Sequence, residues 1–227
     1  LLMKIAVYTS IFGGRDTLHE NQFKMEGVDY LCFTDENFKS DTWNVIKSIP
    51  IYSDPNRNAK KYKILPHRYL KEYDYSVWID GNFLITSDIR DIVERGEYLA
   101  YDHNQSNLDP RDCVYKEYNA IIQLGKQNKG NFKDNPNVMY NQINRYLKEG
   151  YPQNNGLTTN GIMFRNHNNP DIIKLMEEWW LEIKHNSKRD QLSFDYIAWK
   201  NNFKIKYIPG DNRQNSYFTL NRHKKKK

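Results

Sequence analysis

The sequence predicts an α/β domain in which a mainly parallel central sheet is flanked by helices. Two observations support this prediction: short apolar runs that stop at polar or glycine-bearing turns, and their alternation with longer segments of helical periodicity. A chain of 227 residues suits one domain with a sizeable core, and no repeat or compositional break divides it. We therefore expect a single domain over residues 1–227.

Strands are expected where β-branched and aromatic residues run together between turn residues. In chain order these segments are 4–12, 29–34, 43–46, 76–79, 98–101, 161–164 and 204–208. Helices are expected at 56–65, 88–95, 112–127, 136–148, 170–184 and 190–200, with a further short helix opened by Pro66. Asn-rich segments around 104–107, 127–137 and 153–155 are expected to be loops, and such loops often shape a substrate cleft.

The strand over residues 76–79 carries the strongest functional signal, because it ends directly on Asp80-Gly81-Asn82. In an open α/β sheet, ligands bind beyond the carboxyl ends of the strands, so Asp80 and Asn82 stand where a ligand is expected. Two oxygen ligands separated by one glycine can converge on a hard divalent ion. The same three residues are also ordinary turn composition, so the motif alone leaves both interpretations open.

Two further groups could serve a phosphorylated ligand. Arg57, Lys60 and Lys61 share one face of the helix expected at 56–65, and such a face can bind an anion or be simply solvated. Asp190 stands at an expected helix start, where it could cap the helix or face the cleft as a general base or sugar-binding carboxylate. Arg189 and Gln191 beside it could hold a polyol through hydrogen bonds.

Loop residues and the chain end supply weaker candidates. His103 and Arg111 flank the loop 104–110 and could line an acceptor pocket, or decorate the loop only. Asn160, just before a late strand, is a candidate for binding the donor or acceptor sugar. His223 is either an exposed bystander or a ligand.

The charge and cysteine content limit the kinds of molecule that this chain is expected to bind. The net charge is +6, but Lys224–Lys227 supply four charges and leave +2 for the other 223 residues. This balance does not indicate a nucleic-acid-binding surface. The lysine tail is expected to be solvated, with contact to an anionic membrane left open. Cys32 and Cys113 are expected to be buried free thiols, and the absence of a membrane span or signal segment favours a cytoplasmic location.

Five motifs, in order, resemble the glycosyltransferase-like family typified by plant mucilage xylan synthesis proteins. The motifs are Ile5-Ala6-Val7-Tyr8-Thr9-Ser10, Cys32-Phe33-Thr34-Asp35, Arg57-Asn58-Ala59-Lys60-Lys61-Tyr62-Lys63-Ile64-Leu65-Pro66-His67, Trp78-Ile79-Asp80-Gly81-Asn82 and Arg189-Asp190-Gln191-Leu192-Ser193-Phe194. The resemblance as a whole spans about residues 4–223. The resemblance implies a GT-A type fold, with a nucleotide-binding half over about 1–102 and an acceptor-binding half over about 103–223.

By this resemblance, Thr9, Ser10 and Asp35 would meet the base and ribose, and Arg57 and Lys61 the nucleotide or its phosphates. Asp80 and Asn82 look like the Asp-x-Asp motif that holds ribose and metal, with His223 as the ligand that closes the metal site. The resemblance places Asp190 near the acceptor hydroxyl. Asn82 departs from the stricter motif, since a neutral amide replaces a carboxylate and should weaken metal binding. Mixed oxygen and imidazole ligands suit Mn²⁺ at least as well as Mg²⁺.

The function expected is transfer of a sugar from a nucleotide diphosphate donor, UDP-linked by preference, to a glycan hydroxyl. Asp190 would take the acceptor proton if the anomeric configuration inverts, which is the outcome favoured over retention. Two alternatives remain: a sugar-phosphate nucleotidyltransferase, because Gly13-Gly14-Arg15 faintly resembles its glycine-rich loop, and a carbohydrate-binding protein of the same fold without turnover.

Overall fold

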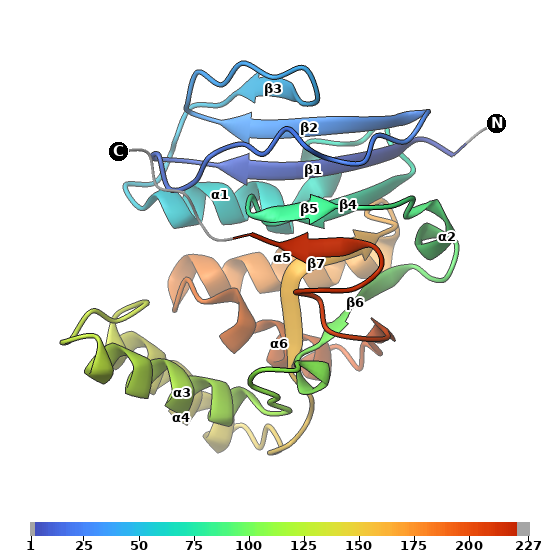
Figure 1. Cartoon of the computed structure of the whole chain (residues 1–227). Helices are drawn as coiled ribbons and strands as arrows, with labels where there is room; N and C mark the ends of the chain where they lie inside the picture. The colour runs from blue at the N-terminus through green and yellow to red at the C-terminus, as the bar shows by residue number, and fades with distance from the viewer. Residues whose placement is uncertain (1–2, 222–227) are drawn as a thin grey trace.

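The centre of the fold is a seven-stranded sheet (Figure 1). A computed structural model describes residues 3–221, so the predictions made for His223 and for the lysine tail lie outside the described residues. The strand order is β3-β2-β1-β4-β7-β6-β8. The strands are β1 (Ile5–Ile11), β2 (Val28–Thr34), β3 (Asn44–Lys47), β4 (Tyr75–Ile79), β6 (Tyr98–Asp102), β7 (Thr158–Arg165) and β8 (Lys206–Ile208).

Strand direction confirms the mainly parallel sheet. The pairs β1–β2, β2–β3, β1–β4 and β6–β8 are parallel, whereas β7 runs antiparallel to both β4 and β6. Every residue of β1 and of β4 is buried. Strands that are covered on both faces are mostly apolar, and this made them recognisable in the sequence.

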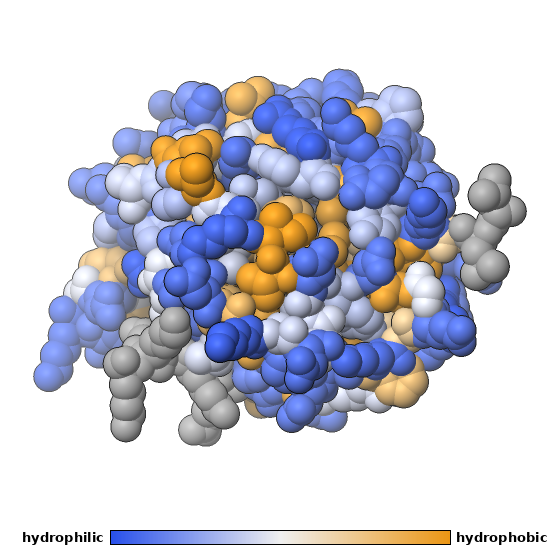
Figure 2. Space-filling view, turned by 90° about the horizontal axis from the view of Figure 1, so that it is seen from above, coloured by the Kyte–Doolittle hydropathy of each residue, from blue (hydrophilic) through white to orange (hydrophobic). Residues whose placement is uncertain are grey.

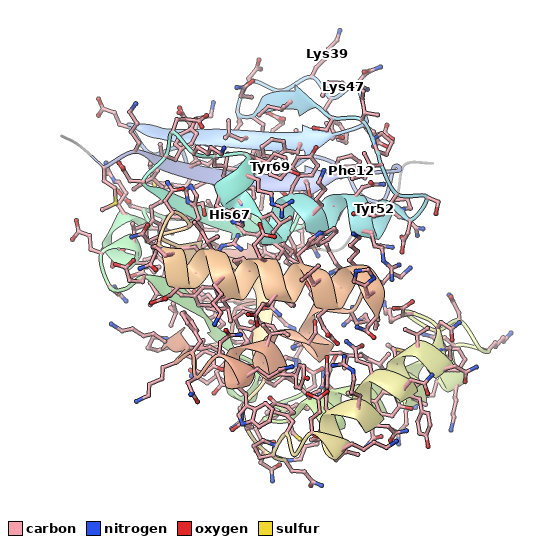
Figure 3. All side chains as sticks on the ribbon, turned by 180° about the vertical axis from the view of Figure 1, so that it is seen from behind. Phe12, Lys39, Lys47, Tyr52, His67 and Tyr69 are labelled. Carbon is pink, nitrogen blue, oxygen red and sulfur yellow. The ribbon has the colours of Figure 1, made fainter. Side chains whose placement is uncertain are left out.

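Helices cover one face of the sheet. Figures 1 and 3 show α1 (Pro55–Ile64) and α5 (Pro170–His185) against that face, with α6 (Phe194–Lys200) beyond them. The helices α3 (Val114–Gln127) and α4 (Pro136–Lys148) lie side by side at one end of the molecule. Both α1 and α5 begin with proline behind a side-chain cap, Asp54 and Asn169 respectively. Their apolar faces and one face of the sheet form the larger core, which includes Tyr8, Ile64 and Trp179.

The opposite face is covered differently from the prediction of helices on both sides. A two-stranded antiparallel sheet of β5 (Phe83–Ile85) and β9 (Phe218–Leu220) lies there, together with the short helix α2 (Arg90–Val93). Their apolar side chains form a second core with the strands. Neither β5 nor β9 was predicted, because three residues are too few to show an alternating pattern.

Three elements differ clearly from the predictions, whereas most other boundaries shift by one or two residues. The helix expected at 88–95 is only Arg90–Val93, and β7 begins at Thr158 rather than at residue 161. The helix expected at 190–200 is divided into a 3-10 turn, Asp190–Leu192, and α6. Asp190 therefore belongs to a separate turn and does not cap α6.

The surface carries no broad apolar area on the face shown in Figure 2, where hydrophobic patches are separated by hydrophilic side chains. Within residues 3–221, none of the helices combines the length and the apolar character needed to cross a membrane.

Candidate active site

The candidate site lies where the strand order reverses. The chain leaves β1 toward β2 on one side, whereas β4 pairs on the other side of β1, so the carboxyl ends of β1 and β4 flank the crevice in which such sheets bind ligands. Asp80 follows β4 directly, and its backbone N–H donates to the Gly161 carbonyl at 2.8 Å. A Cβ at position 161 would lie 2.8 Å from the Phe83 ring and 3.5 Å from Asp80 Oδ2, so glycine keeps the space beside this carboxylate open.

A network of two lysines and two carboxylates forms the centre of the site. Lys63 Nζ lies 2.9 Å from Asp80 Oδ1 and 2.7 Å from Asp190 Oδ2, and Lys60 Nζ lies 2.9 Å from the same Asp190 oxygen. Trp78 Nε1 also donates to Asp80 Oδ1, at 2.8 Å. We call Lys60, Lys63, Asp80 and Asp190 the central network.

Burial and ion pairing have opposite effects on this network. Burial alone would lower the pKa of Lys63, but Asp190 and Asp80 outweigh burial, so its pKa is raised and the ammonium stays charged. Burial would raise the pKa of Asp190, yet Lys60, Lys63 and Arg189 hold it well below its usual range. For Lys60, burial wins over Asp190 and lowers the pKa. A carboxylate with a lowered pKa accepts a proton less readily in the free protein, and the role of Asp190 as a general base stays a prediction.

A first cavity extends from the central network toward the end of β1. It lies between Ser10, Ile11 and Phe12 on the strand side and the first turns of α1 on the other. The charged side chains that line it are Arg15, Asp16, Lys60, Lys63, Asp80, Arg189 and Asp190. Both cationic and anionic side chains therefore line this cavity, and Gly81 forms part of its wall.

A second cavity lies on the other side of Asp80 and shares Lys63, Asp80, Arg189 and Asp190 with the first. Asn82, His103, Asn160 and Gln191 also line it. Asn160 is only 4% exposed, and neither its amide nitrogen nor its amide oxygen has a hydrogen-bond partner within the described residues. Buried polar groups are almost always satisfied, so this side chain is a candidate for binding a polar ligand or an ordered water.

The structure brings together many of the residues predicted for the site. Ser10 and Asp80 line the first cavity, and the second is lined by Asn82, His103, Asn160, Arg189, Asp190 and Gln191. Two other predicted residues lie close to the first cavity without lining it. Thr9 is buried at the end of β1, and Asp35 accepts hydrogen bonds from the backbone of Gly13, which has a positive φ of 63°.

The basic face of α1 needs a correction. Arg57 donates to the Asn186 carbonyl and to Asp54, and Lys61 Nζ lies 5.6 Å above the Tyr69 ring. Figure 3 shows Tyr69 and Phe12 on the side of α1 that faces the strands. Lys60 and Lys63, three residues apart, point to the carboxylates instead, so Arg57, Lys60 and Lys61 do not converge on one point.

Sequence reasoning missed three contributors. Lys63 lies within a quoted motif, and its spacing from Lys60 was a usable signal because residues three apart share a helix face. Trp78 was seen as a strand residue only. Arg213 lines the second cavity from a loop whose sequence gives no such indication.

The described residues could coordinate a divalent metal only together with a substrate that supplies further oxygen atoms. Among residues 3–221, no three His, Cys, Asp or Glu side chains are grouped to hold an ion. Asp80 and Asn82 provide two oxygen-bearing side chains at one edge of the second cavity, while Asp80 Oδ1 already accepts from Lys63 and Trp78. Magnesium-type ions are commonly held by one or two carboxylates together with substrate phosphates, and Asp80 with Asn82 suits that arrangement.

Comparison with known proteins agrees with this geometry. The sequence matches the family described as the TOD1/MUCI70 glycosyltransferase-like domain over residues 2–223. It is 28% identical over 244 residues to a protein of Arabidopsis thaliana named "Probable hexosyltransferase MUCI70", covering 93% of this chain and 40% of that protein. The chain thus spans less than half the length of this relative. The family match extends over nearly the whole chain and includes both cavities, so the chain belongs to the TOD1/MUCI70 glycosyltransferase-like domain family.

Proposed function

We propose that this domain transfers a hexosyl group from a nucleoside diphosphate sugar to a hydroxyl of a glycan, on a GT-A type fold. One observation carries the proposal: two cavities share a group of ion-paired lysines and carboxylates at the switch point of the sheet, and Lys63 and Asp190 of this group are buried. A transferase needs this arrangement, because donor and acceptor must approach one reacting centre from two sides. The family match and the name of the Arabidopsis relative support the same reaction class.

The first cavity is the proposed donor site. Its position at the ends of β1 and β4 is where open α/β sheets bind nucleotides. Four cationic side chains line it, so a diphosphate placed there would meet Arg15, Lys60, Lys63 and Arg189. These groups would stabilise the negative charge that develops on the departing diphosphate. UDP is the nucleotide we propose, by the resemblance of the five motifs.

Asp190 positions the two lysines at the junction of the cavities. It holds Lys60 and Lys63 through one oxygen, so it sets where both ammonium groups lie relative to the donor. This positioning role rests on the two ion pairs, and removal of the acceptor proton by Asp190 stays a prediction. If Mn²⁺ enters with the donor, Asp80 and Asn82 are the residues that would hold it, and the ion would supply further positive charge to the diphosphate.

The second cavity is the proposed site for the transferred sugar and the accepting hydroxyl. Asn160, Gln191 and His103 all line it and offer amide and imidazole groups for hydroxyl recognition. Burial and the neighbouring Arg111 lower the pKa of His103, so the ring is neutral at pH 7. Its Nε2 accepts from Arg111 at 3.3 Å, which leaves Nδ1–H as the donor without a partner among the described residues. Neutral amide and imidazole groups can bind the hydroxyls of neutral and of charged sugars alike.

Incubation with a panel of nucleotide sugars and Mn²⁺, with release of free nucleoside diphosphate as the measurement, tests the proposal. We expect slow donor hydrolysis that disappears in Asp80→Asn, which preserves shape and leaves Lys63 paired with Asp190. Asp88→Asn is the matched control, because Asp88 pairs with Arg90 at the surface. Release of pyrophosphate from UTP and a sugar phosphate would establish the nucleotidyltransferase instead. Saturable sugar binding without turnover, even when glycan acceptors are added, would establish the binding protein.

A further inference from the structure

A third cavity continues outward from the second and has an unusual concentration of arginine. His103, Arg189, Gln191 and Arg213 line both cavities, so the two are continuous. The third is bounded on its far side by α3, through Ala120, Ile121 and Leu124. We call Arg111, Arg189 and Arg213, all of which line this cavity, the arginine cluster.

The carboxylates around the arginine cluster do not balance its charge. Arg111 pairs with Glu117 at 2.8 Å and with Asp109 at 3.2 Å, and Arg213 pairs with Asp109 at 2.6 Å. Arg189 lies 3.5 Å from Glu117, at the limit of a hydrogen bond. Two carboxylates therefore serve three guanidinium groups. The cavity also contains the exposed Lys133, so its lining carries an excess of positive charge.

Two nitrogen atoms at this cavity also have no hydrogen-bond partner among the described residues. Arg189 Nε is buried without a partner among the described residues, and so is His103 Nδ1. Planar guanidinium groups bind carboxylate and phosphate oxygens in pairs of hydrogen bonds, and leftover donors in a cationic cavity favour an anion. A neutral ligand would leave this charge unmatched.

We propose that the arginine cluster binds an anionic group of the acceptor, a carboxylate or a phosphate ester, while the accepting hydroxyl enters the second cavity. The inference rests on the proposed function, because it takes the second cavity as the place of transfer. It makes the acceptor an acidic glycan or a phosphorylated one, and it assigns Arg213 and Arg111 to acceptor specificity. Neither residue reaches the first cavity, so donor binding is independent of them.

The test compares charged and neutral forms of the same skeleton. An oligouronate tetrasaccharide and its methyl ester differ only in charge, and a phosphorylated maltotetraose with its unphosphorylated parent provides the second pair. We expect calorimetric titration to show at least roughly tenfold tighter binding of one acid than of its neutral match, the size of one charge-assisted hydrogen bond. The pair that shows the gain identifies the anion as carboxylate or phosphate.

Variants then locate the effect. Arg213→Gln and Lys133→Gln should each reduce the preference for the acid, and Arg213→Gln should nearly abolish it. Lys133 is exposed, so its replacement carries little risk to folding. Arg68→Gln is the matched control, because Arg68 pairs with Glu177 on a different surface. Equal binding of both acids and their neutral matches, or an unchanged preference in Arg213→Gln, would overturn the inference.

Nucleoside diphosphate binding separates this inference from the proposed function. It should be the same in Arg213→Gln as in the wild type, because it takes place in the first cavity. A protein that binds nucleoside diphosphates but has no preference for acids refutes only the arginine cluster as an anion site. A protein that binds no nucleoside diphosphate at all refutes the proposed function.

Discussion

Replacing Lys60 by glutamine should weaken the binding of a nucleoside diphosphate, whereas the same change at Lys61 should not. The two lysines are adjacent in α1, but Lys60 lines the first cavity and Lys61 lies above the Tyr69 ring. Comparing the two variants therefore distinguishes the loss of a charge that faces the cavity from the loss of one that does not. Helix length, cap and net charge are the same in both variants.

The size of the effect follows from what Lys60 contacts. A hydrogen bond to a charged group contributes about 1.5–3 kcal/mol, but Lys60 already binds Asp190 at 2.9 Å in the free protein. A diphosphate must share or displace this contact, so we expect a loss near or somewhat below the lower end of this range. A loss of about 1–2 kcal/mol corresponds to roughly five- to thirtyfold weaker binding. Lys61→Gln should instead cost only about 0.5–1 kcal/mol of stability, the value of an exposed cation–π contact.

Isothermal titration with UDP measures the affinities, and urea unfolding measures the stabilities. Asp190 keeps Lys63 as its partner in Lys60→Gln, so we expect that variant to stay folded. The reasoning would be refuted if Lys61→Gln lost affinity while Lys60→Gln kept it. That result would show that the diphosphate contacts Lys61, on the helix face that was predicted from the sequence.

Three further predictions use other parts of the structure. Burial raises the pKa of Asp195 from 3.8 to about 6, so the folded chain keeps a proton that the unfolded chain releases. The free energy of unfolding should therefore fall by at most about 3 kcal/mol as the pH rises from the lower to the higher of these pKa values. Urea titrations at pH 4 and pH 7 measure this change, and the same titrations on Asp195→Asn give the part that does not depend on Asp195. Asn160→Ala should lower transferase turnover without lowering the melting temperature, because the amide it removes has no partner within the described part of the chain; a large loss of stability would show a structural role. Mn²⁺ should bind in calorimetry only when UDP is present, since Asp80 and Asn82 alone provide too few ligands, and equally tight binding without UDP would contradict this.

The sequence predicted those parts of the fold that depend on local composition. Strands β1 and β4 are buried over their whole length, and a run of apolar residues that ends in a glycine or a carboxylate is visible without any tertiary contact. The pair β5–β9 was not visible, because it joins Phe83 to Leu220 across most of the chain and each strand has only three residues. Long-range pairing of short strands leaves no periodic signal.

The candidate site shows the same division. Asp80, Asn82 and Asp190 were identified because strand ends and motif carboxylates can be located in a sequence. The partners of those carboxylates could not be, because Lys63 reaches Asp80 and Asp190 only after α1 has packed against the sheet. One helix face is about 100° wide and can carry several lysines, so the sequence does not show which of them reaches the site. The packing of α1 directs Lys60 and Lys63 toward the carboxylates and Lys61 toward the Tyr69 ring.

The charges that line the first cavity explain why a cation is expected to accompany the donor. Arg15, Lys60, Lys63 and Arg189 are opposed by Asp16, Asp80 and Asp190, so four positive groups meet three negative ones. The single surplus charge is smaller than the charge of a diphosphate, which carries two or more negative charges at neutral pH. Some of these carboxylates must then be compensated from elsewhere when the donor binds, and a divalent ion held against Asp80 by the diphosphate itself would do so. Asp190 is compensated within the site itself, because it pairs with both Lys60 and Lys63, so Asp80 is the carboxylate that such an ion would serve.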